Sequence, residues 1–197
     1  MKFNSDIDID LGDRTQALAH IKHVPASILR DGRLVKHNSG IYVTDIPVDP
    51  FTGQASIDHQ AAEVRGYIKL DLLNVSLYTQ IKSEAHLTEL MQREPLWDLL
   101  LDPGFFSLLI HVGNHHATLL KMPEPITSIP RLAMFLAVIR PAKRHLLGQT
   151  WAEIARTVWE RPSDDSYYFK KAHAVGYAHL VAVNMNLICE QVSYGYS

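Results

Sequence analysis

The spacing of the apolar residues changes along this chain, and the change limits the folds that it can adopt. In residues 6–11 three aspartates alternate with three aliphatic residues, which is the period-two pattern of a β-strand. Shorter strand patterns follow at residues 41–44 and 66–71. Beyond them, apolar residues recur at helical spacing between prolines. We therefore predict an α+β fold, with a mixed sheet and helices in residues 1–82 and a mostly helical part in residues 83–197.

The same spacing predicts individual helices. Residues 13–24 place apolar side chains near one side of a helix, and Pro25 would end it. A second helix is predicted from Leu72, with apolar residues continuing at helical spacing to Ile81. In residues 151–159, two tryptophans flank three smaller apolar residues, which indicates a buried helical stripe.

Composition and charge narrow the functional classes. The 197 residues are 47% hydrophobic and 20% charged, which is ordinary for a globular protein. A net charge of −2 is not the strongly basic balance that by itself indicates nucleic-acid binding, so such a role would need a local basic face or a basic partner. One cysteine, Cys189, fits a reducing compartment. Neither a signal-peptide pattern nor an apolar run long enough to cross a bilayer is present, so we expect a cytoplasmic protein with no membrane partner.

The alternation near the N-terminus gathers carboxylates on one face of a strand. Asp6, Asp8 and Asp10 would be neighbours, each roughly 7 Å from the next. Neighbouring carboxylates repel one another unless a cation lies between them, and Mg²⁺ prefers oxygen ligands. Lys69 and Asp71 share one face of a later strand, so a cation and a third carboxylate would point into the same cleft. The pattern has two interpretations, a two-metal phosphoryl-transfer site and a solvated acidic edge strand.

Five segments resemble sequence blocks of one enzyme family, in the same order along the chain. The segments are SDIDIDLGDR, VKHNSGIYV, GYIKLDLLNV, FLAVIRPAKRHLLG and YYFKKAHAVGYAHLVAVNMNLI. They resemble the C-family DNA polymerases, the type of the bacterial DNA polymerase III alpha subunit. The resemblance implies a partial palm with a nucleotidyltransferase-like fold in residues 1–82 and a helical, fingers-like region in residues 83–197.

The resemblance also implies roles for particular residues. Asp8, Asp10 and Asp71 match the catalytic aspartates that bind two Mg²⁺ ions, for which Mn²⁺ can substitute; Asp6 matches an aspartate not usually counted as a ligand. The residues implied in nucleotide binding are Lys36, His37, Lys69, Arg140, Lys171, His173 and Tyr177. The implied reaction adds deoxynucleotides to a primer 3′ end, with primer–template DNA and dNTPs as partners.

Several departures from the family leave alternatives open. Asn38 and Ser39 replace small residues, Asn74 stands where glycine is usual, and RPAKR replaces Arg-Pro-Gly-Pro. The family's Gly-Ser-rich turn and DNA-binding modules have no counterpart in this sequence. We therefore expect either a split-polymerase subunit whose second chain supplies these parts, or a non-catalytic reduced paralogue that binds nucleotide, DNA or a replisome partner. Transfer without a template is a third alternative. So compact a version indicates a phage, and hence a bacterial or phage-infected host cell.

Two further groups of basic residues have competing interpretations. Lys143, Arg144 and His145 follow Arg140 closely and would form either a phosphate or DNA contact or a solvated charge run. The adjacent histidines of GNHHAT point apart on regular structure, so we expect loop or helix-start residues there rather than zinc ligands.

Overall fold

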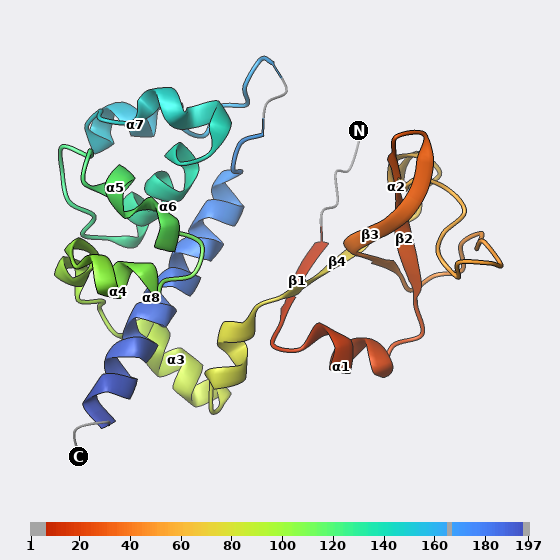
Figure 1. Cartoon of the computed structure of the whole chain (residues 1–197), viewed down its shortest axis with the longest axis horizontal. Helices are drawn as coiled ribbons and strands as arrows, with labels where there is room; N and C mark the ends of the chain where they lie inside the picture. Colours follow the sequence, from red (N-terminus) through yellow and green to blue (C-terminus); the bar gives the residue numbers. More distant parts are fainter. Residues whose placement is uncertain (1–6, 165–166, 195–197) are drawn as a thin grey trace. The chain divides into compact units, whose positions relative to one another are not determined.

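The protein is described by a computed structural model that covers residues 7–164 and 167–194 (Figure 1). It divides into two compact units, Met1–Lys82 and Ser83–Ser197. The division falls where the spacing of the apolar residues changes from strand to helix. The predicted α+β class is confirmed, since a mixed sheet and helices are both present. Asp6 lies outside the described residues.

The first unit is built on a four-stranded mixed sheet with the order β1-β4-β3-β2. β1 runs parallel to β4, whereas β3 is antiparallel to both of its neighbours. The elements of this unit are β1 (Ile7–Leu11), α1 (Arg14–Ala19), β2 (Val24–Arg30), β3 (Arg33–Tyr42), α2 (His59–Val64), β4 (Leu70–Asn74) and the 3-10 helix η1 (Ser76–Gln80). The aspartate-rich alternation is therefore confirmed as a strand, and it lies at the edge of the sheet.

The helix predicted over residues 13–24 is wrong beyond its first half. α1 ends at Ala19, and Pro25 lies inside β2 rather than after a helix. β2 and β3 form a hairpin whose two-residue turn, Asp31 and Gly32, has φ angles of 49° and 74°. An Asp-Gly pair between apolar runs is a strong hairpin signal because it adopts positive φ easily. This turn could therefore have been predicted from the sequence.

The helix predicted from Leu72 is also wrong. β4 continues to Asn74 and is followed by the short 3-10 helix η1. β4 lies between β1 and β3, so its backbone hydrogen bonds are made to two strands, and Leu72 is buried in the sheet core. Pairing on both sides overrides the helical spacing of the leucines. Asn74 then accepts a hydrogen bond from the Arg14 backbone N–H at 3.0 Å, next to the start of α1.

The second unit is mostly helical, as predicted. Its elements are α3 (Glu84–Gln92), η2 (Trp97–Leu101), α4 (Pro103–Ser107), η3 (Gly113–His115), α5 (His116–Leu119), α6 (Ile129–Val138), η4 (Pro141–Leu146), α7 (Trp151–Thr157) and α8 (Lys171–Tyr194). α6 lies against the long helix α8 (Figure 1), and every residue from 132 to 138 is buried. A helix that is apolar on all sides must lie inside a protein, and α6 forms the centre of this unit's core.

The stripe predicted in residues 151–159 is confirmed in part, since Ala155 is exposed and Trp159 is only half-buried. Trp151, Ile154 and Val158 are all buried in the core. Thr150 and Glu153 form a capping box at the start of α7, which satisfies two backbone N–H groups. In the part of the chain that the structure describes, no helix has the length and apolar character needed to cross a membrane.

Candidate functional site

Two carboxylate-bearing residues face one another across β1 and β4. Asp8 of β1 is the register partner of Asp71 of β4, and Asp10 is the partner of Leu73. Paired residues on neighbouring strands lie about 5 Å apart and point to the same face of the sheet. Asp8 and Asp71 therefore lie side by side, with Asp10 two register pairs further along on the same face. Asp8 and Asp10 are exposed, because β1 is the edge strand.

The Asp71 carboxylate is held by two side chains. Lys69, the residue before β4, forms an ion pair with Oδ2, so its side chain lies on the same side as Asp71, as their spacing predicts. Ser39 of β3 donates its hydroxyl to Oδ1 at 2.7 Å. The side chain of Asp71 is only 13% exposed, and these partners compensate the burial of its charge. Sequence reasoning missed Ser39, because a serine in a strand carries no signal for its cross-strand partner.

His37 turns toward the same carboxylate because β3 is irregular at this point. Pro25 pairs with Ile41, and Ser27 pairs with Lys36. The pairing thus moves by two positions on β2 but by five on β3, so β3 contains extra residues here. The extra residues let the His37 Nδ1 accept backbone N–H bonds from Gly40 at 2.9 Å and Ser39 at 3.3 Å.

These two donors decide the state of the His37 ring. Nδ1 acts as an acceptor, so the ring is neutral and carries its proton on Nε2. The 3.7 Å separation between Nδ1 and the Asp71 Oδ1 is therefore not an ion pair. Burial, followed by the positive charge of Lys69, lowers the pKa of His37 and keeps it neutral. The ring also packs edge-on against His59, 5.3 Å away between centroids.

Gly40 leaves the space that this arrangement needs. It is the register partner of Asp71 on β3. A Cβ atom at this position would lie 2.8 Å from the Lys69 Cδ and 3.0 Å from both Ala26 Cβ and His37 Nδ1. Such distances are well inside van der Waals contact. The glycine therefore allows the Lys69 side chain to cross β3 and reach Asp71.

The donor chemistry of Asp8 and Asp71 suits Mg²⁺. Magnesium is usually held by one or two protein carboxylates, with phosphate oxygens and water completing its shell, and these two carboxylates share a face at paired positions. Among the described residues, no group of three or more His, Cys, Asp and Glu side chains is close enough to hold a metal ion by itself. The described residues thus offer two carboxylates at paired positions, Asp8 and Asp71, rather than a set of three ligands.

Lys36 occupies a different environment from its neighbour His37. It is exposed on β3 and is the register partner of Ser27 on β2. The structure thus brings Lys69 and His37 to Asp71, while Lys36 lies on the hairpin, at the start of the irregular segment.

In the second unit, three predicted nucleotide-binding residues gather around Phe169. The Arg140 guanidinium carbon lies 4.8 Å from the centroid of the Phe169 ring. Tyr177 stacks on that ring at 5.3 Å, and His173 lies 6.2 Å from it. The fourth predicted residue, Lys171, is exposed at the first position of α8. Sequence reasoning missed Phe169, although it lies two residues before Lys171 in the same quoted segment.

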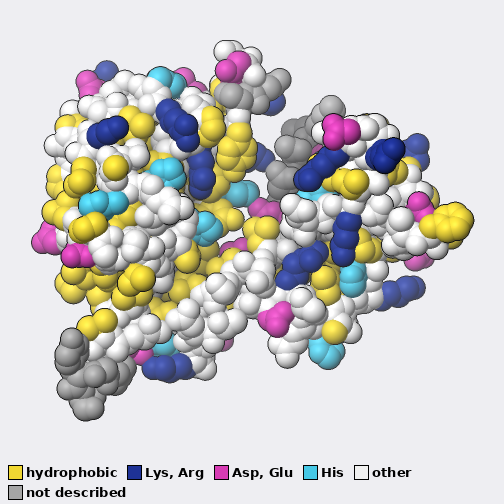
Figure 2. All heavy atoms as spheres, in the orientation of Figure 1, with side chains coloured by type: hydrophobic (Ala, Val, Ile, Leu, Met, Phe, Trp, Pro, Cys, Tyr) yellow, Lys and Arg dark blue, Asp and Glu magenta, His cyan; other side chains and the backbone are white. Residues whose placement is uncertain are grey.

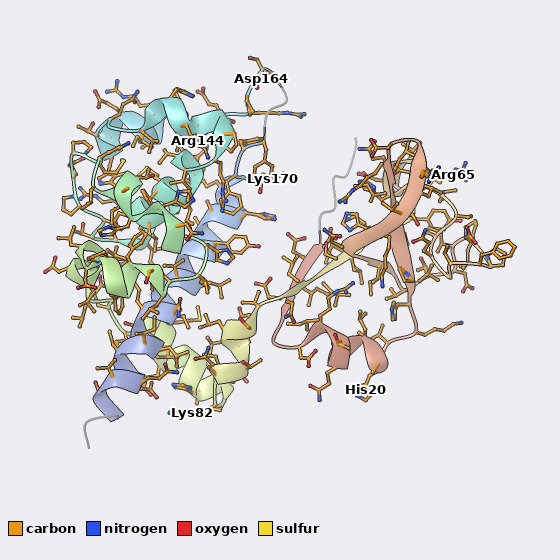
Figure 3. All side chains as sticks on the ribbon, viewed as in Figure 1. His20, Arg65, Lys82, Arg144, Asp164 and Lys170 are labelled. Carbon is orange, nitrogen blue, oxygen red and sulfur yellow. The ribbon has the colours of Figure 1, made fainter. Side chains whose placement is uncertain are left out.

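The basic run after Arg140 separates into two kinds of residue. Lys143 is buried, and its ammonium donates to the Thr157 backbone carbonyl at 2.7 Å. Arg144, labelled in Figure 3, and His145 are exposed. The interpretation as a solvated charge run therefore applies to the last two residues, and Lys143 is a structural residue.

The visible surface carries mixed charge. On the face of the described residues that Figure 2 shows, Lys and Arg side chains are scattered among acidic, histidine and hydrophobic ones on both units. Affinity for DNA depends mainly on neutralising phosphates. This face does not form one broad basic surface.

Comparisons of the chain with known protein families, with curated proteins and with solved structures found no match.

Proposed function

We propose that the chain is a catalytic fragment or split subunit of a DNA polymerase III alpha-like enzyme, which adds deoxynucleotides to a primer 3′ end with two Mg²⁺ ions. The observation that carries the proposal is the pairing of Asp8 with Asp71 on neighbouring parallel strands, with Lys69 on the Asp71 carboxylate. Primer–template DNA, dNTPs and a second polymerase chain are the partners in this proposal. Replication places the reaction in the cytoplasm of a bacterial or phage-infected cell.

The residues of the sheet have separate roles in this reaction. Asp8, Asp10 and Asp71 would hold the metal ions, which would neutralise the negative charge of the triphosphate. Lys69 donates to Asp71, and in the proposed reaction its ammonium would also donate to phosphate oxygens. His37 is held neutral, so it orients Ser39 and Gly40 without adding charge. The same proposal assigns nucleotide binding to Lys36, Arg140, Lys171, His173 and Tyr177.

The alternative is a non-catalytic reduced paralogue that binds nucleotide, DNA or a replisome partner. One observation favours it: both oxygens of Asp71 already have protein partners, Lys69 and Ser39. A carboxylate balanced in this way is stable without a metal ion. The two functions differ in whether Asp71 is needed for chemistry or only for the fold.

Primer extension separates the two functions. The full chain is incubated with a short primer–template, four dNTPs and Mg²⁺ or Mn²⁺, beside Asp71→Asn and the exposed control Asp45→Asn. The proposal predicts extension that falls by about 100-fold or more in Asp71→Asn, as expected when transition-state charge stabilisation is removed, and is unchanged in Asp45→Asn.

Other outcomes have defined meanings. Extension that does not depend on Asp71 would contradict the assigned site. Extension without a template would favour template-independent transfer. If the wild-type chain does not extend a primer, the stand-alone enzyme is excluded, and the assay is repeated with a candidate second chain. dNTP binding that is equal in wild type and Asp71→Asn, without extension, would favour the reduced paralogue.

A further inference from the structure

The second unit contains a cavity beside its cationic and aromatic cluster. The cavity measures 260 Å³ and lies in the turn between α4 and α5. Its lining residues are Ser107, Leu109, His111, Gly113, Asn114 and His115. Pockets that enclose whole drug-sized ligands usually measure about 300–1,000 Å³. This cavity is therefore sized for one group of a ligand rather than for a complete nucleotide.

The turn that forms the cavity adopts an uncommon conformation. His111 has a φ of 62°, and the Val112 N–H donates to the Ile110 carbonyl at 2.7 Å. This is a γ-turn of the positive-φ kind, which is rare and strained. Close packing at Gly113 and one side-chain hydrogen bond accompany this turn. A Cβ on Gly113 would lie 2.9 Å from the Ser107 carbonyl oxygen, and buried Asn184 of α8 accepts the Ile110 N–H at 2.9 Å.

The conformation presents His111 to the aromatic cluster. Its ring lies 4.3 Å, edge-on, from the ring of Tyr177, which stacks on Phe169. The strained turn and the cluster of Arg140, Phe169 and Tyr177 are therefore one continuous structure. Strain that the surrounding packing maintains is concentrated at binding sites.

The charges that act on the cavity are positive. Partial burial and then the charge of Arg140 lower the pKa of His111. Burial, followed by the charges of Arg140 and Arg144, lowers the pKa of His115. Arg140, the residue before η4, thus influences both histidines of the cavity, and Arg144 of η4 also influences His115. An anion between these groups would relieve their mutual repulsion.

Arg140 also has an unused donor. Its Nε–H is buried and has no hydrogen-bond partner among the described residues, while the guanidinium plane lies over the Phe169 ring. A buried donor without a partner is unfavourable, because it has lost its hydrogen bonds to water. The fork of the guanidinium matches the oxygens of a phosphate group.

We propose that this cavity binds a phosphate group, with Arg140, His111 and His115 as donors and Tyr177 as the neighbouring aromatic wall. The phosphate belongs to a free nucleotide or to a nucleic-acid backbone, whose remaining parts stay outside the cavity. This inference deepens the nucleotide-binding role proposed for Arg140 and Tyr177 and to that extent rests on it. It requires no catalysis by the aspartates of the sheet, so the two proposals can fail separately.

The test observes the imidazole C2–H resonances of the full chain by NMR while sodium pyrophosphate is added. A parallel titration uses a short single-stranded oligonucleotide. The proposal predicts saturable shifts of the His111 and His115 resonances. Arg140→Gln and His111→Asn should each weaken binding about tenfold, the expected effect of one charge-assisted hydrogen bond. Asparagine tolerates positive φ, so His111→Asn preserves the turn.

Controls and contrary outcomes are defined by the same titration. His145→Asn changes an exposed histidine outside the cavity lining and should bind like the wild type. Exposed Arg144→Gln serves as a second charge variant if Arg140→Gln fails to fold. Shifts with the oligonucleotide alone would support the site and assign the phosphate to nucleic acid. No saturable shift with either probe, or equal binding by folded Arg140→Gln, would overturn the proposal. Asp71→Asn should bind pyrophosphate normally whether or not it extends a primer.

Discussion

Asp8 and Asp71 are paired across neighbouring parallel strands, although 62 positions separate them in the chain. Asp71 is partly buried and ion-paired with Lys69, whereas Asp8 is exposed at the sheet edge. The pair therefore places an exposed carboxylate beside a partly buried one that Lys69 and Ser39 hold. This asymmetry makes the residues of the sheet experimentally distinguishable.

The first prediction concerns metal binding at this pair. Asp8 lies beside Asp71, and Asp10 lies beside Leu73, so Asp8→Asn should weaken Mn²⁺ binding more than Asp10→Asn. Loss of an outer-shell partner alone costs a metal site about 10- to 100-fold in affinity, so loss of Asp8 should cost about 100-fold. Electron paramagnetic resonance of free Mn²⁺, in the presence of a dNTP, measures both affinities. Equal losses in the two variants would contradict the assigned pair.

The second prediction concerns Gly40. Gly40→Ala would force a Cβ into Lys69, Ala26 and His37, and overpacking of this kind costs about 1–3 kcal/mol of unfolding free energy. Gly12→Ala is the matched control in the same unit, because its Cβ would meet neighbours at an ordinary 3.5 Å. Urea unfolding, followed through amide resonances of Met1–Lys82, measures the unfolding free energy of each variant. Equal stability of the two variants would show that Lys69 moves aside without cost.

The third prediction is a pH dependence from His37. Its pKa is lowered below 6.5 in the folded state, so the unfolded chain takes up this proton first as the pH falls. The contribution of His37 to stability is complete above pH 6.5, decreases as the pH falls through that value, and levels off below the folded-state pKa.

Two variants isolate this contribution. Between about pH 7.5 and about pH 5.5, the unfolding free energy of the first unit should fall less in His37→Gln than in the wild type. His20→Gln, at an exposed position labelled in Figure 3, should keep the wild-type dependence. A wild-type slope in His37→Gln would mean that other groups carry the titration.

The fourth prediction separates two neighbouring basic residues. Lys143→Gln removes the buried donor to the Thr157 carbonyl and should cost about 1–3 kcal/mol of stability, with little effect on pyrophosphate binding. Arg144→Gln should weaken pyrophosphate binding and should have little effect on stability. All three tryptophans lie in Ser83–Ser197, so tryptophan fluorescence in urea reports on this unit. Weaker phosphate binding by a folded Lys143→Gln would contradict the structural role.

Several features of the candidate site followed from local sequence. The alternation in β1 and the common face of Lys69 and Asp71 were predictable, because strand geometry fixes which neighbours share a face. The buried stripe of α7 was predictable from its helical period for the same reason. The hairpin of β2 and β3 could have been predicted from Asp31 and Gly32 but was not, and the helix predicted over residues 13–24 ends at Ala19.

Other features depended on contacts between distant segments. Ser39 donates to Asp71 and Gly40 leaves room for Lys69 only because β3 pairs with β4. No local sequence pattern predicts either role. Lys143 reads as a surface charge in sequence, yet the fold buries it against α7. The sequence made no prediction for His111, and a turn with positive φ brings its ring to Tyr177.

The sequence by itself therefore determined the class of the fold, the helical character of the second unit and the faces of individual strands. Each of these depends on the period of a single element, which the backbone sets locally. Only the tertiary structure decided that Asp8 lies beside Asp71, that His37 stays neutral and that Arg140 joins Phe169 and Tyr177. These relationships depend on which distant segments pair and bury one another, and that choice is made by the packing of the whole unit.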